Sequence, residues 1–333
     1  QVRDASGAWE PLRRGRALAP GEEVRTEDDG TVVLSSGSGS FEMARGAWLI
    51  VRSAQHVVAR TGKILASAQR SVRLDDESGL SAVAKEGSFR LDVGTRVAVY
   101  RGSVSVSLPA GAVEVPVGRE VTLGLVAPDV RAIAIDPNDP WDVRLLADAI
   151  QIDRALRPYQ RTFDASTASD QKSLDFFGRY VEAGAIGFLG PLLPARLARY
   201  GKFDVLVALF IGIERSGALG TPLTATFAEV IALRDEGASF GLAAQVLGVK
   251  PQPLLQRVVT GLTPGAPPQR VEPTRRPGQP TPSPQPTGSR SPSSSPSPSP
   301  TGTGEPSPSP SPTQSSPTPT SSPTCIEILG LCP

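Results

Sequence analysis

The sequence of 333 residues predicts a multi-domain protein with an all-β N-terminal domain, an all-α domain after it and a disordered C-terminal tail. Up to about residue 125, apolar and polar residues alternate, which is the period of half-buried strands. Between residues 136 and 260 the apolar spacing changes to the 3.6-residue period of helices. From residue 263 onward Pro, Ser and Thr dominate, and such a stretch cannot bury enough apolar surface to offset its ordering entropy.

The β-domain, residues 1–130, is expected to consist of short strands separated by turns. Alternation is clearest in Arg96–Tyr100 and Ser103–Leu108, and it also runs through Phe89–Val93. Gly-containing turn signals recur roughly every ten residues, as at Asp29-Gly30 and Arg101-Gly102. Short strands with closely spaced turns are typical of a solenoid of short strands or a β-sandwich.

The helical domain, residues 136–260, opens with a clear start signal. Asp139 can accept backbone N–H bonds as an N-cap, and Pro140 suits the first helical position. The apolar residues that follow are spaced to share one helix face: Leu145, Leu146, Ala149, Ile152 and Leu156. Pro158 is expected to end or kink this helix. Further helices are predicted over about 169–186, 195–217, 222–236, 239–248 and 251–260.

The tail divides into a Pro/Ser/Thr-rich stalk, residues 263–324, and a terminal peptide, residues 325–333. A low-complexity stalk of this composition is expected to be extended and disordered, and it resembles O-glycosylated stalks. The terminal peptide contains the chain's only cysteines, Cys325 and Cys332, with four aliphatic residues between them. We expect a disulfide between them, which would contribute ~2–3 kcal/mol and require an oxidising compartment. Two reduced thiols on a frayed end are the alternative.

Composition argues against several functional classes. The 34 Lys and Arg nearly balance the 33 Asp and Glu, whereas a nucleic-acid binder that works by bulk charge has a basic excess. The segment Ala244–Val249 is similar to the turn of a helix-turn-helix. The segment after it, which begins Lys250–Pro253, contains two prolines and few cations, so it is poorly suited to contact DNA. We therefore expect a packed helical hairpin and no nucleic-acid partner. The longest apolar run, residues 203–213, is about half of a membrane span.

No motif in the sequence predicts catalysis, a cofactor or a metal site. The single histidine, His56, lies in a predicted strand without an evident partner, so a structural role is expected. The acidic run Asp75–Glu77 is interpreted as a solvated loop. The segment Asp136–Pro140 is similar to the start of a calcium loop, but Trp141 replaces the glycine needed at its sixth position. A helix cap is the better interpretation of Asp139. We therefore expect a protein that is not an enzyme.

The N-terminal region resembles the FecR-like domain of extracytoplasmic bacterial proteins. The resemblance is carried by Trp9–Leu12, Gly15–Thr26, Gly30–Leu34 and Gly39–Met43, and later by Tyr100–Val106. It covers about residues 9–125 and implies an all-β stack of short strands outside the cytoplasm. In well-understood members this domain relays a signal from an outer-membrane receptor to an anti-sigma segment. The given sequence departs from this pattern, since it shows neither that cytosolic segment nor a membrane helix and adds a helical domain and a stalk, so binding or scaffolding is the role expected to carry over.

These observations together predict a secreted or cell-envelope-associated bacterial binding or scaffold module. Arg outnumbers Lys 29 to 5, which is associated with bacterial genomes of high GC content, and a start at Gln1 fits removal of a secretory signal peptide. The expected partner is an envelope protein or polysaccharide. A FecR-type sensor subunit and a subunit of a self-associating extracellular fibre are the alternatives.

Overall fold

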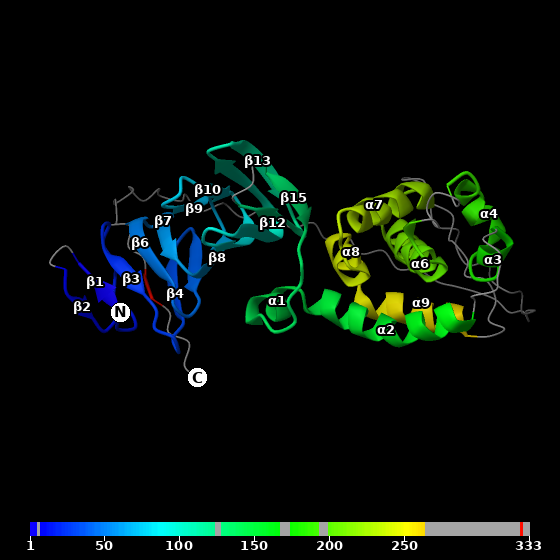
Figure 1. The fold of residues 1–333 in the computed structure, drawn as a ribbon, viewed down its shortest axis with the longest axis horizontal. Coiled ribbons are helices and arrows are strands. Elements are labelled where there is room, and N and C mark those ends of the chain that lie inside the picture. Colours follow the sequence, from blue (N-terminus) through cyan, green and yellow to red (C-terminus); the bar gives the residue numbers. More distant parts are fainter. Residues whose placement is uncertain (5–6, 124–127, 167–173, 193–198, 264–326, 329–333) are drawn as a thin grey trace, which may run out of the picture. The chain divides into compact units, whose positions relative to one another are not determined.

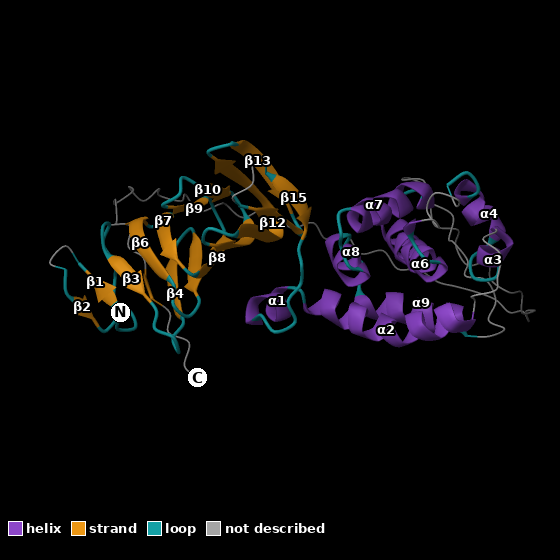
Figure 2. Cartoon of the chain, viewed as in Figure 1, coloured by secondary structure: helices purple, strands orange, loops and turns teal. Residues whose placement is uncertain are grey.

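The computed structural model describes residues 1–4, 7–123, 128–166, 174–192, 199–263 and 327–328. Strands occupy the N-terminal part of the chain and helices follow them, as Figures 1 and 2 show. This order confirms the predicted succession of a β-region and an α-region. The strands and helices form one compact unit. The stalk prediction concerns residues that lie almost entirely outside the described ones.

The strands form two sheets that share one long strand, β12 (Arg96–Leu108). Sheet 1 also contains β1 (Val2–Arg3), β2 (Trp9–Glu10), β3 (Glu23–Arg25), β6 (Trp48–Ser53), β7 (His56–Thr61), β9 (Val72–Asp76), β10 (Ser81–Ala84) and β13 (Gly111–Pro116). Sheet 2 also contains β4 (Val32–Ser36), β5 (Gly39–Met43), β8 (Lys63–Ala68), β11 (Gly87–Asp92), β14 (Arg119–Thr122), β15 (Asp129–Ala132) and β16 (Glu327–Ile328). The strand pairs are antiparallel except for β7 with β9, which is parallel.

The two sheets enclose a hydrophobic core. In sheet 2, strand register places Leu34, Phe41, Ala66, Phe89 and Val99 side by side across five strands. All five are at most 1% exposed. Because successive side chains of a strand point to opposite faces, this row belongs to the inner face of sheet 2. The core residues of sheet 1, such as Val24, Leu49 and Leu74, belong to the same cluster.

β12 leaves one sheet and joins the other at a pair of glycines. Its first half pairs with β11 and β14, and its second half pairs with β10 and β13. At the changeover, Gly102 lies opposite Gly87, and both have positive φ angles, +72° and +123°. A Cβ on Gly87 would lie 2.1 Å from the Arg101 carbonyl oxygen. Only glycine permits the two backbones to approach this closely.

The helical part contains α1 (Pro140–Leu145), α2 (Ala147–Ser166), α3 (Leu174–Gly178), α4 (Ala183–Ile186), the 3₁₀ turn η1 (Gly187–Leu189), α6 (Lys202–Leu219), α7 (Leu223–Asp235), α8 (Phe240–Val246) and α9 (Pro251–Leu262). Helices α6 to α9 confirm the predicted segments to within a few residues at most ends, although α6 begins later than expected. The single helix expected over 169–186 was wrong, because the described part of that segment forms two short helices, α3 and α4. Helices α8 and α9 follow one another around the turn at Gly248, but both pack more on α2 than on each other, so the expected packed hairpin was wrong. The start of α1 also agrees with the sequence, since Asp139 accepts the backbone N–H groups of Trp141 and Asp142.

The first helix differs from the expectation in two ways: it is not continuous, and it does not end at Pro158. The chain forms two helices, which meet at Leu146, instead of one. Helix α2 then continues through Pro158 to Ser166. Burial of one face explains the continuation, because Ala149, Ile152 and Leu156 are at most 4% exposed and hold the helix against its neighbours. Tertiary packing here outweighs the loss of one backbone hydrogen bond at proline.

Candidate functional site

The outer face of sheet 2 is covered by the helical part and carries charged side chains. Strand register places Glu42, Leu65, Arg90, Ala98 and Glu120 in one row across five strands. This row alternates with the inner row that contains Phe41 and Phe89, so it lies on the opposite face. Leu65 and Ala98 pack into the same hydrophobic cluster as the helices. Sheet 2 is therefore buried on both faces near its centre, and its outer charges need partners. Arg96 and Arg131 of the sheet pair with Glu120, whereas Glu42 and Arg90 pair with residues at the start of the helical part.

Arg90 is the largest buried side chain of this row, and its carboxylate partners come from the start of α1 and from its own strand β11. Its side chain is 0% exposed. Its Nη1 atom lies 3.1 Å from Asp139 Oδ2 and 3.2 Å from Asp142 Oδ1, and its Nε atom lies 2.9 Å from Asp92 Oδ1. The Tyr100 hydroxyl donates a 2.6 Å hydrogen bond to Asp142 Oδ1. We call Arg90, Asp92, Tyr100, Asp139 and Asp142 the arginine cluster.

The electrostatics of the arginine cluster follow from burial and charge pairing. Burial opposes the charge on Arg90, but the surrounding Tyr100 oxygen and carboxylates outweigh it and raise the pKa of Arg90. Burial raises the pKa of Tyr100, and the adjacent Asp142 adds to this, so the phenol stays protonated and donates. Burial alone would raise the pKa of Asp139, but hydrogen bonding to Lys63 and the nearby Arg90 lower it. The cluster joins β11 to the start of α1 through ion pairs, and the buried Arg90 Nη2 has no hydrogen-bond partner among the described residues.

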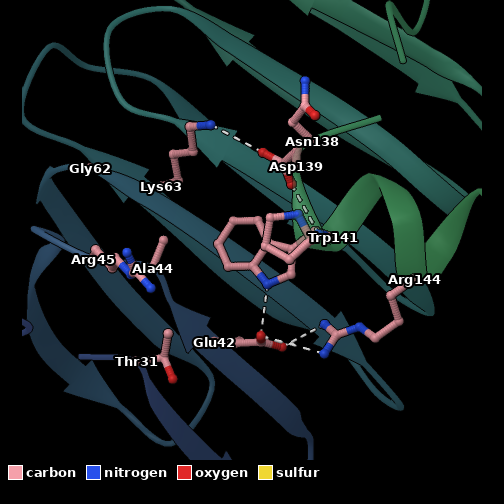
Figure 3. A pocket seen from close by; sticks show the side chains of 11 residues that line it. Thr31, Glu42, Ala44, Arg45, Gly62, Lys63, Asn138, Asp139, Trp141 and Arg144 are labelled. Atoms are coloured by element: carbon pink, nitrogen blue, oxygen red, sulfur yellow. Dashed lines mark hydrogen bonds and ion pairs between the residues drawn. The ribbon is translucent and has the colours of Figure 1, made fainter. Parts of the chain in front are cut away.

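A pocket of about 740 Å³ lies beside the arginine cluster, between strands β5 and β8 and the start of α1. Figure 3 shows the Trp141 side chain at its centre. The indole Nε1–H donates a 2.7 Å hydrogen bond to Glu42 Oε1, and Arg144 Nη2 lies 2.6 Å from the other Glu42 oxygen. Lys63 Nζ lies 3.1 Å from Asp139 Oδ2. The lining residues are Thr31, Glu42, Ala44, Arg45, Gly62, Lys63, Asn138, Asp139, Pro140, Trp141 and Arg144.

The charges around the pocket are unequal. Both lining carboxylates, Glu42 and Asp139, are held in ion pairs and are largely buried. Three cations line the opening, of which Arg144 and Lys63 have side chains that are 49% and 48% exposed. The third, Arg45, is exposed and makes no hydrogen bond or ion pair with the residues that the structure describes. The pocket therefore presents an indole, small apolar groups and a net positive rim.

This combination is suited to binding. A pocket of 300–1,000 Å³ with mostly apolar walls and a few fixed polar groups is the usual form of a small-ligand site. Because Trp141 and Arg144 are held in place by Glu42, little ordering entropy is lost when a ligand binds. A ligand with an apolar or stacking surface and a negative charge complements these walls.

The structure places the histidine and the acidic run in a separate network on sheet 1. His56 Nε2 lies 2.8 Å from Asp75 Oδ2, and Arg73 Nε lies 2.8 Å from Asp75 Oδ1. Burial alone would raise the pKa of Asp75, but hydrogen bonds from Arg73, Ser81 and His56 lower it. The histidine therefore has an acidic partner, Asp75 of strand β9, which the sequence did not indicate.

The interpretation of Asp75–Glu77 as a solvated loop was wrong for its first two residues. Asp75 and Asp76 end strand β9, and Asp76 is 6% exposed. Asp76 Oδ1 accepts the backbone N–H groups of Ser78 and Leu80 at 2.8 and 3.0 Å, and so stabilises the turn that follows.

Among the residues that the structure describes, none form a group of three or more His, Cys, Asp or Glu placed to hold a metal ion. Asp139 caps α1, in agreement with the helix-cap interpretation over the calcium loop. The predicted disulfide partners Cys325 and Cys332 lie outside the described residues. None of the helices in the described ranges combines the length and hydropathy of a bilayer span.

Sequence reasoning identified Asp139 but missed the other members of the site. The alternation through Phe89–Val93 places Arg90 at a polar strand position, and such positions are solvated when a sheet has one wet face. A signal was present in strand β11, where Arg90 stands between two apolar residues and is followed by Asp92. Trp141 directly follows Pro140, the first residue of α1, and this position does not distinguish a pocket wall from a core residue.

Comparisons with known proteins give limited information. No family model matches the chain, and no curated protein matches it. Two crystal structures of a candidate anti-sigma factor from Parabacteroides distasonis are similar to 32% of this chain and 57% of theirs. The sequence identities are 11% and 10%, with TM-scores of 0.29 and 0.28. The chain thus spans little more than half of those proteins, and a similarity of this size establishes neither family nor role.

Proposed function

We propose that the chain is a non-enzymatic, extracytoplasmic binding protein of the bacterial cell envelope, built on a FecR-like β-domain. Its ligand enters the pocket between sheet 2 and α1 and carries a negative charge. The FecR-like resemblance of residues 9–125 and the tail composition support the location. The geometry of the pocket supports the binding role.

One observation carries the proposal. The two acidic residues of the pocket are paired with cations: Glu42 with Arg144, and Asp139 with Lys63 and Arg90. Arg45 lies at the opening and has no acidic partner in the described part of the chain. A carboxylate on the ligand can pair with Arg45, while its ring or apolar surface contacts Trp141. Among envelope components, a polysaccharide that contains uronic acids has both features.

The binding experiment compares a charged and a neutral sugar. The full chain is titrated by calorimetry with an oligogalacturonate and with a neutral malto-oligosaccharide of equal length. We expect binding of the acidic oligomer alone, weakened about three- to tenfold by Arg45→Ala, in keeping with one partly exposed charge pair. Arg52→Ala is the matched control, because Arg52 is exposed on β6 and is not part of the pocket lining. Equal affinity for both sugars, or an equal effect of both substitutions, would contradict the proposal.

The location has its own test. Protein taken directly from the producing cells is fractionated and treated with a thiol-labelling reagent. An extracytoplasmic protein should be found in the envelope or the medium, with Cys325 and Cys332 unlabelled because they are joined. A cytoplasmic fraction with two reactive thiols would remove the location from the proposal and leave the pocket to be judged by binding.

A sensor role in envelope signalling is the second candidate, and one feature favours it. The pocket is lined by both β5–β8 and α1, and α1 leads directly into α2 through Leu146. A ligand that contacts Trp141 and Arg144 can therefore change how firmly α1 holds the sheet. A sensor should show altered hydrogen exchange in α2 when the acidic oligomer binds, whereas a pure binding module should show protection confined to the pocket.

A further inference from the structure

Strand β4 is an edge of sheet 2 that lacks the usual protection against pairing. The other edges of the described sheets are shielded: β2 has only two residues, β13 carries Glu114 and Pro116, and β15 carries Asp129 and Arg131. Short length, charge and proline are the features by which edge strands avoid joining other chains. In contrast, β4 has five residues, Val-Val-Leu-Ser-Ser, with neither a charge nor a proline.

The free side of β4 is occupied by the far end of the same chain. Strand β16 pairs antiparallel with β4, with Glu327 opposite Ser35 and Ile328 opposite Leu34. The other side of β4 pairs with β5 over all five residues. Because the N–H groups of successive strand residues point to opposite sides, one of Leu34 and Ser35 directs its backbone groups toward β16. The main chain of the terminal peptide therefore satisfies an edge that would otherwise be open.

The terminal peptide has the sequence of a strand donor. Residues 325–332 read Cys-Ile-Glu-Ile-Leu-Gly-Leu-Cys and follow a long polar stretch that contains almost no aliphatic residue. β-branched residues favour extended conformation, and Ile326 and Ile328 are separated by two positions, so they fall on the same face of an extended strand. Strand addition of this kind takes its affinity from main-chain hydrogen bonds.

We propose that β4 is a strand-acceptor site whose ligand is the chain's own C-terminal peptide, which caps the edge and prevents β4 from pairing with a second copy. The tail is then tethered at both ends, to α9 and to β4, instead of ending free. Because donor and acceptor belong to one chain, capping does not depend on protein concentration, whereas pairing between copies does. This inference does not rest on the proposed pocket ligand.

The test follows hydrogen exchange of β4 in four proteins. They are the full chain, a chain that ends at Thr324, Ile328→Pro, and the matched control Ser316→Pro, which adds a proline to a stretch already rich in them. Exchange in β11, at the centre of sheet 2, reports whether each variant remains folded. A synthetic peptide of residues 324–333, added to the shortened chain, tests the pairing directly.

At low protein concentration we expect at least about tenfold faster exchange of one β4 amide in the shortened chain and in Ile328→Pro, with Ser316→Pro unchanged. Added peptide should restore the protection. The shortened chain should also gain mass with concentration by sedimentation, while the full chain does not. Equal β4 exchange in all four proteins with β11 intact would overturn the acceptor site. Equal self-association of the full and shortened chains would overturn the capping role.

Discussion

Removing Asp142 should release α1 from sheet 2, because this carboxylate is the centre of the arginine cluster. Asp142 is 0% exposed and accepts from the Tyr100 hydroxyl, from Arg90 Nη1 and, at 2.8 Å, from the Asp136 backbone N–H. Asp142→Ala leaves Arg90 buried with one counter-ion fewer and the Tyr100 hydroxyl without its acceptor. Removing one partner of a buried ion pair typically destabilises a protein by about 3–5 kcal/mol.

For a folded part of this size, a loss of ~3–5 kcal/mol lowers the melting temperature by roughly 6–20 °C. Chemical denaturation gives the free energy of unfolding, and calorimetry gives the melting temperature. Asp129→Ala is the matched control, because Asp129 is exposed on β15 and its loss should change the free energy by no more than about 0.5 kcal/mol. If Asp142→Ala changed the free energy of unfolding as little as Asp129→Ala does, the arginine cluster would not be what holds α1 against sheet 2.

Two further predictions concern the glycine pair where β12 passes from one sheet to the other and the pH dependence of the arginine cluster. Gly87→Ala should destabilise the fold by more than about 3 kcal/mol, because its Cβ would lie 2.1 Å from the Arg101 carbonyl oxygen. Gly94 also has a positive φ but faces open space, so Gly94→Ala should destabilise the fold by only about 1 kcal/mol. Equal losses of stability for the two variants in chemical denaturation would contradict the close approach at Gly87. Asp139→Asn keeps a good N-cap but removes the charge that pairs with Lys63 and Arg90. Because the pKa of Asp139 is lowered on folding, its charge stabilises the protein above the unfolded pKa of 3.8, and this contribution disappears as the pH falls through the folded pKa. Wild type should therefore exceed the variant in stability at pH 7 and converge with it in strong acid; a difference that is constant with pH would refute this.

The sequence predicted the local structure well where local signals are strong. Alternation in Ser103–Leu108 and the Asp139-Pro140 cap both identified elements that the structure contains. Pro158 shows the limit of such signals, because a helix buried along one face tolerates a residue that would break an isolated helix. Likewise, Asp76 was assigned to a solvated loop from its neighbours in sequence, although it supports a turn from a buried position.

The candidate site was beyond prediction for a physical reason. The alternation that predicts strands assigns Glu42 and Arg90 to a wet face, and nothing in that pattern shows that α1 covers it. The contacts that define the site join residues far apart in the chain, such as Glu42 with Trp141 and Arg90 with Asp142. The sheet edge at β4 was missed likewise, since its partner lies close to the opposite end of the chain.

The most direct test of the pocket as a binding site observes the Trp141 indole N–H by NMR during titration of the full chain with the oligogalacturonate. The chain has three tryptophans, and Trp9 and Trp48 contact each other on sheet 1, away from the pocket lining. Binding in the pocket should shift the Trp141 signal with saturation and leave the other two in place. A titration that moved Trp9 or Trp48 and left Trp141 unchanged would contradict the assignment of the pocket.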